Sequence, residues 1–154
     1  MYTCELYMKK GTKIPYLQVM ENEVMEQRPY FFTPGDFYNA LNGMEVTDLF
    51  EEKLYIFPLN IRNRLTGGLC EVSKGGRDCS IVDAKSIFTR LLLCGASRFA
   101  VVHNHPSGDP TPSSYDKDVC KKLKEVGSLL EIEMIDFIIV CEDSYFSFKT
   151  MNMM

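Results

Sequence analysis

Several features that often mark function are scarce or missing in this sequence. It contains no tryptophan, only two histidines among 154 residues, and six cysteines without a Cys-x-x-Cys pair. Scattered cysteines exclude a zinc-finger framework and a dithiol redox motif, so we expect all six to remain thiols in a reducing compartment. An apolar run long enough to span a membrane is absent, and charges from Glu5 onward interrupt any secretory signal. We therefore expect a soluble, cytoplasmic protein without a membrane partner.

The sequence also lacks an excess of positive charge. Its formal net charge is −4 and its pI is about 5.2, which gives no global attraction for nucleic acid. The chain has 154 residues, of which 45% are hydrophobic, so it is long enough for one sizeable core and too short for two. Composition therefore predicts a single compact domain.

Apolar periodicity and turn residues predict alternating strands and helices. An N-terminal hairpin is expected from two strand-like runs, 2–8 and 14–19, around Lys-Lys-Gly-Thr-Lys. Helices are predicted over 33–43, 83–95 and 113–127, each with a capping residue first and a glycine last. Strands are predicted over 53–59, 65–73, 99–104, 132–141 and 145–148. This order predicts an α/β sandwich with a mixed sheet.

The two histidines, His103 and His105, lie two residues apart at the end of the apolar run 99–102. Because side chains alternate along a strand, both imidazoles are expected on one face of the sheet. Asp116, at the start of the next helix, can return a carboxylate to that face. Two imidazoles and one carboxylate form the three-ligand set that leaves a fourth zinc position open for water, as in catalytic zinc sites.

A purely structural interpretation of these residues stays open. Histidines at alternate strand positions also occur as a surface pair, and the Pro/Gly/Ser segment after them as an ordinary loop. Ser113 and Asp116 fit a capping box, with Ser113 at the N-cap and Asp116 at N3. Only the joint spacing, His-x-His followed by Ser-x-x-Asp, favours a metal site.

This joint spacing resembles the signature of the JAMM metalloproteases, whose domain is also called the MPN domain. The stretch 103–116, which begins His-Asn-His-Pro-Ser-Gly-Asp-Pro, is similar to the bacterial RadC branch of that family. Three other segments resemble the family's domain opening, first core strand with its turn, and late strand; they are 32–36, 54–63 and 134–140. The resemblance covers roughly residues 32–148.

The resemblance implies a fold and a domain organisation. The fold would be a mixed β-sheet flanked by helices, with cytidine-deaminase-like layering. An N-terminal hairpin extension would occupy residues 1–31, and the RadC-like MPN domain residues 32–154.

The resemblance also implies roles for individual residues. His103, His105 and Asp116 would bind Zn²⁺, and Glu71 would be the glutamate that takes the proton of the attacking water. Ser113 would help to stabilise the tetrahedral oxyanion.

The residues themselves leave a second interpretation open for two of these roles. Glu71 lies in the strand-like run 69–72, where an outward polar side chain on a half-exposed strand is equally ordinary. One Ser113 hydroxyl has to serve either as helix cap or as catalytic donor. Asn104 and Ser107 are further candidates for groups that support the ligands.

Three classes of function remain open. The first is a zinc metallopeptidase or isopeptidase with an unidentified peptide or protein substrate. The second is an accessory protein in DNA repair or mobile-element DNA metabolism. The third is a catalytically silent MPN scaffold. Each is compatible with a homo-oligomer.

The case for a nucleic-acid partner depends on family association. Lys117, Lys121 and Lys124 recur on one helix face, where a row of lysines also serves simply as a solvated surface. Many longer relatives carry an N-terminal helix-hairpin-helix that binds DNA. Here only the hairpin segment precedes the resembling domain, so the family's main reason for a DNA partner is missing from this sequence.

Overall fold

A five-stranded mixed sheet forms the centre of the molecule. The computed structural model describes residues 2–12, 14–21, 30–44, 46, 50–74 and 82–154. The sheet strands are β3 (Lys53–Leu59), β4 (Cys70–Lys74), β5 (Arg98–Asn104), β6 (Glu133–Val140) and β7 (Tyr145–Ser147). Their order is β4-β3-β5-β6-β7, and only the pairing of β5 with β6 is parallel among these described strands.

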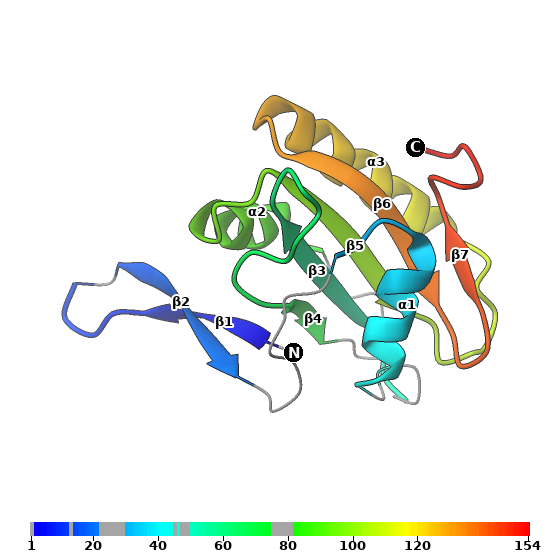
Figure 1. Ribbon diagram of the computed structural model, residues 1–154, viewed down its shortest axis with the longest axis horizontal. Coiled ribbons are helices and arrows are strands. Elements are labelled where there is room, and N and C mark those ends of the chain that lie inside the picture. The colour runs from blue at the N-terminus through cyan, green and yellow to red at the C-terminus, as the bar shows by residue number, and fades with distance from the viewer. Residues whose placement is uncertain (1, 13, 22–29, 45, 47–49, 75–81) are drawn as a thin grey trace.

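Helices cover both faces of this sheet. They are α1 (Pro34–Asn42), α2 (Ala84–Leu93) and α3 (Ser114–Leu129). The first face packs against α2 and α3 through a core cluster that includes Ile87 and Leu123, and the second packs against α1 through Phe37 and Leu41. Figure 1 shows α1 in front of the sheet and α3 behind it. The predicted α/β fold with a mixed sheet flanked by helices is confirmed, and it is consistent with the MPN fold that the resemblance implies.

Local capping explains where the helices begin. Asp36, at the third position of α1, accepts the backbone N–H groups of Phe32 and Thr33, each at 2.8 Å. Asp83 caps α2 by accepting the Lys85 N–H at 3.1 Å. Both starts agree with the prediction from sequence. None of the helices in the described ranges is long and apolar enough to cross a membrane.

The predicted role of Gly127 as a helix stop is wrong. Helix α3 continues to Leu129, and a Cβ at Gly127 would come within 2.6 Å of the Ile132 carbonyl oxygen and 3.0 Å of the Phe99 ring. The glycine therefore allows α3 to pack closely on β5 and on the following turn. The reversal itself occurs at Glu131, which has a positive φ of 56°.

The predicted strand over residues 65–73 is also shorter than expected. Strand β4 begins only at Cys70, because the chain turns at Gly67, whose φ of +75° belongs to the left-handed region that glycine tolerates. Leu65 keeps a single bridge to Leu59. The difference matters because β4 carries Glu71.

The N-terminal hairpin is present as predicted. Its strands, β1 (Tyr2–Met8) and β2 (Pro15–Glu21), pair antiparallel and extend away from the domain in Figure 1. The hairpin meets the sheet beside β4, where the Cys4 N–H donates to the Leu69 carbonyl at 2.9 Å.

The cysteines do not all remain thiols as expected. Cys4 and Cys70 form a disulfide, because the docked hairpin brings their Cα atoms to 5.3 Å. Cys94, Cys120 and Cys141 are free, and Cys79 lies outside the described residues.

Candidate metal centre

The two histidines extend from the end of β5 on the sheet face that α2 and α3 cover. His103 pairs with Leu54 of β3, and its ring lies edge-to-face with the His105 ring at a centroid distance of 4.9 Å. His103 is buried, at 8% exposure. Strand alternation therefore places both imidazoles together, as the His-x-His spacing predicts.

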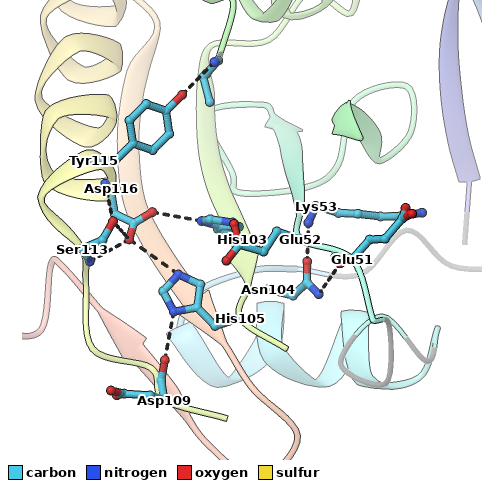
Figure 2. Close-up of polar contacts among 11 residues, drawn as sticks. Glu51, Glu52, Lys53, His103, Asn104, His105, Asp109, Ser113, Tyr115 and Asp116 are labelled. Atoms are coloured by element: carbon cyan, nitrogen blue, oxygen red, sulfur yellow. Dashed lines mark hydrogen bonds and ion pairs between the residues drawn. The ribbon is translucent and has the colours of Figure 1, made fainter. Parts of the chain in front are cut away.

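Asp116 reaches both histidines from the first turn of α3. Its Oδ1 lies 3.0 Å from His103 Nδ1, and its Oδ2 lies 3.5 Å from His105 Nε2 (Figure 2). The carboxylate is almost fully buried, at 2% exposure. Burial alone would raise the pKa of Asp116, but hydrogen bonds from His103, His105 and Ser113 outweigh burial and hold the pKa well below its usual range. The carboxylate is therefore ionised.

A backbone contact orients the His105 ring. Its Nδ1 lies 2.9 Å from the Asp109 carbonyl oxygen, which only accepts hydrogen bonds, so Nδ1 carries the proton and Nε2 faces Asp116. Burial lowers the pKa of His105, but the contacts with Asp116 and Asp109 outweigh it and raise the pKa. The loop after β5 thus fixes which nitrogen is available to a metal ion.

A glutamate that the sequence analysis did not select completes the cluster. Glu52, directly before β3, places its Oε2 3.6 Å from His103 Nε2. One ligand atom each from Glu52, His103 and His105 lies within 4.8 Å of the others. The Glu52 side chain is 57% exposed, so water reaches it from solvent. Glu52 therefore combines proximity to the histidines with solvent access.

Glu71, the glutamate predicted for this position, lies on the other face of the sheet. It pairs with Tyr55 across β3 and β4, and Tyr55 pairs with Val102, which alternates with His103 along β5. Its Oε2 contacts Lys53 Nζ at 3.1 Å. Burial, together with the neighbouring Glu71 carboxylate, raises the pKa of Tyr55. Glu71 is thus held in a structural polar cluster, and the structure does not bring it to the histidines.

Asn104 holds the segment that carries Glu52. Its Oδ1 accepts the Lys53 N–H at 2.6 Å, and its Nδ2 donates to the Glu51 carbonyl at 3.1 Å. The amide therefore bonds the backbone on both sides of Glu52, as Figure 2 shows. Asn104 is 1% exposed, so water does not compete for these bonds. The sequence predicted that Asn104 supports the metal ligands, whereas its hydrogen bonds here go to the backbone beside Glu52.

Ser113 caps α3 and contacts the proposed ligand Asp116. Its Oγ accepts the Asp116 N–H at 3.1 Å and donates to Asp116 Oδ2 at 2.6 Å, while its own N–H donates to the same Oδ2 at 2.8 Å. The capping box is therefore complete. The single hydroxyl proton points to Asp116, so in this arrangement the cap role of Ser113 prevails over an oxyanion role. Ser107 Oγ accepts a long hydrogen bond of 3.4 Å from the Asp109 N–H.

The local sequence carries no sign that distinguishes Glu52 from its neighbour Glu51. The signal lies in the pairing of β3 with β5, where Leu54 faces His103. Two residues before Leu54, Glu52 lies at the end of β3 that is next to the histidine-bearing end of β5, and its carboxylate reaches His103. Only a register assignment identifies Glu52.

The donor set fits a zinc ion. Two imidazoles and one ionised carboxylate are borderline and hard ligands of the kind found in catalytic zinc sites, and the carboxylate and His105 are each held by further hydrogen bonds. Glu52 offers a fourth ligand group, a carboxylate at the exposed side of the cluster.

Comparison with known proteins points to one family. The family model described as the RadC-like JAB domain matches residues 32–153. A UPF0758 protein of Clostridium beijerinckii is 34% identical over 117 residues, which cover 76% of this chain and 50% of the relative. A UPF0758 protein of Clostridium novyi is 37% identical over 79% of this chain and 53% of the relative. The chain thus spans about half the length of these curated relatives.

Proposed function

Because the chain belongs to the family of RadC-like JAB domains, we propose that it is a zinc-dependent hydrolase of the JAMM type that cleaves peptide or isopeptide bonds. In this proposal, His103, His105 and Asp116 hold the ion, and Glu52 is the general base. The observation that carries it is the 3.6 Å approach of the Glu52 carboxylate to His103, on the same sheet face as Asp116.

The proposed roles follow from the surroundings of each group. A bound zinc ion would lower the pKa of a water molecule toward neutrality. Asp116 supplies negative charge beside both imidazoles, and its low pKa keeps it ionised across the physiological range. The exposed Glu52 carboxylate accepts a proton from the attacking water and passes it to the leaving amine. The Asn104 hydrogen bonds to Lys53 and Glu51 hold the backbone that carries Glu52.

Glutamate substitutions test this assignment. Glu52→Gln is expected to retain about one zinc per chain and to lose about 10²–10⁴-fold in the hydrolysis rate, because the proton acceptor is removed. Glu51→Gln, one residue earlier on the exposed surface, is the matched control and should keep wild-type activity. The measurements are metal analysis of the purified chain and turnover of a panel of peptide and isopeptide substrates. Equal activity of Glu52→Gln and wild type would refute the role of Glu52.

A silent MPN scaffold is the second candidate, and one observation favours it. The Ser113 hydroxyl proton is engaged by Asp116 and is not directed to a substrate oxygen. Stoichiometric zinc without turnover across the whole substrate panel would support this candidate over the hydrolase.

The lysine row gives little added support to a nucleic-acid partner. Lys117, Lys121 and Lys124 line a groove on α3 together with Asp118 and Glu125, so the local positive charge is partly cancelled.

A further inference from the structure

Three sulfur atoms gather where the N-terminal hairpin meets the sheet. Cys4 on β1 is bonded to Cys70 at the start of β4. Cys94, the C-cap residue of α2, is a free thiol whose sulfur lies within 4.8 Å of the other two. Cys4 and Cys70 are buried, whereas Cys94 is half-buried. A free thiol next to a disulfide is the starting arrangement for thiol–disulfide exchange.

The turn before β4 is shaped around these sulfurs. The Gly68 carbonyl oxygen lies 3.3 Å from the Cys4 sulfur and 3.6 Å from the Cys70 sulfur. A Cβ at Gly67 would come within 3.0 Å of the Cys94 sulfur, so any side chain there would displace the third sulfur. Burial raises the pKa of Cys94, and a backbone hydrogen bond from Gly68 partly opposes this rise. The backbone therefore holds Cys94 beside the disulfide.

We infer that Cys94 is an exchange thiol that opens and re-forms the covalent bond between the hairpin and the sheet. The Cys94 thiolate attacks the Cys70 sulfur, so that a Cys70–Cys94 bond forms and the Cys4–Cys70 bond breaks. Cys4 leaves as a thiolate and takes up the proton that Cys94 released. One disulfide and one thiol exist before and after the step, so it needs neither an oxidant nor a reductant. The inference is independent of the proposed hydrolase.

Attack at Cys70 has a defined structural consequence. Cys70 and Cys94 both belong to the sheet and its helices, whereas Cys4 belongs to the hairpin. After exchange, the crosslink lies within the domain. The hairpin is then held by its non-covalent contacts with the domain, such as the Cys4 N–H bond to the Leu69 carbonyl and the bridge between Thr3 and Leu69. Exchange thus controls how firmly the hairpin is attached.

The same spacing also satisfies a thiolate metal site, which makes it the main competing interpretation. Two observations favour exchange instead. Cys4 and Cys70 are already paired, which leaves only one thiol for a metal. The Gly68 carbonyl oxygen lies beside both paired sulfurs, and its negative end would repel a cluster of thiolates.

Disulfide mapping tests the inference on the full chain. A Cys79→Ser background removes the thiol that lies outside the described residues. The oxidised protein is incubated without oxygen at several pH values, quenched with acid, alkylated, digested and mapped by mass spectrometry without reduction. We expect crosslinked peptides of both Cys4–Cys70 and Cys70–Cys94. The exchange rate should rise about tenfold per pH unit below the pKa of Cys94, because the thiolate is the attacking species.

Two variants make the result decisive. Cys94→Ser should yield only the Cys4–Cys70 crosslink, whereas Cys120→Ala, which removes a buried thiol on α3, should leave both isomers. Hydrogen exchange of residues 2–8 should speed up in proportion to the Cys70–Cys94 fraction. A wild-type chain that keeps only Cys4–Cys70 at alkaline pH, while Cys94 still reacts with the alkylating agent, would overturn the inference. So would purified protein that contains no disulfide and holds one metal ion through all three thiols.

Discussion

Two glutamates, Glu52 and Glu71, lie close to the first residues of β3 but on opposite faces of the sheet, where they contact different residues. Glu52 lies on the face of α2 and α3, 3.6 Å from His103, and is 57% exposed. Glu71 lies on the α1 face, where Lys53 and Tyr55 hold its carboxylate. Both carry a carboxylate and lie close to the first residues of β3, Glu52 directly before the strand and Glu71 opposite Tyr55. Of the two, only Glu52 approaches the histidines, as the proposed general base has to do.

The difference shows that the alternation of side chains along a strand decides which carboxylate reaches a site on one face of the sheet. Lys53 and Glu52 are adjacent in the chain, so their side chains leave the backbone in opposite directions. Lys53 consequently pairs with Glu71, while Glu52 meets the histidines. Changing a residue on one face should therefore leave the other face largely intact.

The largest effect is expected from a substitution on the sheet face that carries the histidines. Asp116→Asn removes the only buried negative charge between the described histidines, and we expect it to lose zinc and hydrolytic activity together. In the metal-free protein it should cost about 3 kcal/mol or more in the free energy of unfolding, because a buried partner is removed. Metal analysis and chemical denaturation measure these two effects.

The loss of stability in Asp116→Asn depends on pH in a direction that the pKa of Asp116 sets. Because the pKa of Asp116 is lower in the folded than in the unfolded protein, its contribution is present above the ordinary carboxyl pKa and is lost as the pH falls through the folded value. The stability difference between wild type and Asp116→Asn should therefore shrink in strong acid. A difference that grows as the pH falls below the ordinary carboxyl pKa would contradict the assigned direction for Asp116.

An intermediate effect is expected from Asn104, which lies on the α1 face but fixes the backbone around Glu52. Asn104→Ala removes two partly buried hydrogen bonds and leaves backbone groups of Glu51 and Lys53 without this partner, a cost of about 1–3 kcal/mol. We expect zinc content to remain at the wild-type level and kcat to fall by more than KM changes, since the base is misplaced and the ligands are untouched.

Asn104 lies on one face of the sheet and fixes the backbone of a segment whose glutamate lies on the other face. Parallel losses of zinc and activity in Asn104→Ala would show that the residue supports the whole cluster and not the Glu52 segment alone. Asn104→Asp serves as a second variant, because it keeps one acceptor for the Lys53 N–H and loses the donor to Glu51.

The smallest effect is expected from the Lys53–Glu71 pair itself. Both side chains are partly exposed, at 19% and 29%, so their coupling in a double-mutant cycle of Lys53→Met and Glu71→Gln should be about 1 kcal/mol or less. Glu71→Gln should retain zinc and activity. Loss of activity in that variant with the fold intact would reverse the roles given to the two glutamates.

Much of the fold followed from local patterns in the sequence. The helix starts at Thr33 and Asp83 and the strand over residues 53–59 agree with prediction, because caps and apolar periodicity act within a few residues. The prediction failed at Gly127 and at the start of β4. In both places a glycine leaves room for a residue that is distant in the chain. Gly127 lies against the Phe99 ring, and Gly67 lies against the Cys94 sulfur.

At the candidate site, local spacing was enough to predict that the two histidines and Asp116 lie together. His103 and His105 share a face because of strand alternation, and Asp116 lies in the first turn of a capped helix that follows a short loop. Which glutamate lies beside them, and that the Ser113 hydroxyl donates to Asp116, became visible only in the folded chain. Choosing Glu52 over Glu71 depends on the register between β3, β4 and β5, and pairing the hairpin's Cys4 with Cys70 depends on where the hairpin docks. Such choices are made by pairing between segments far apart in the chain, and no local spacing encodes that pairing.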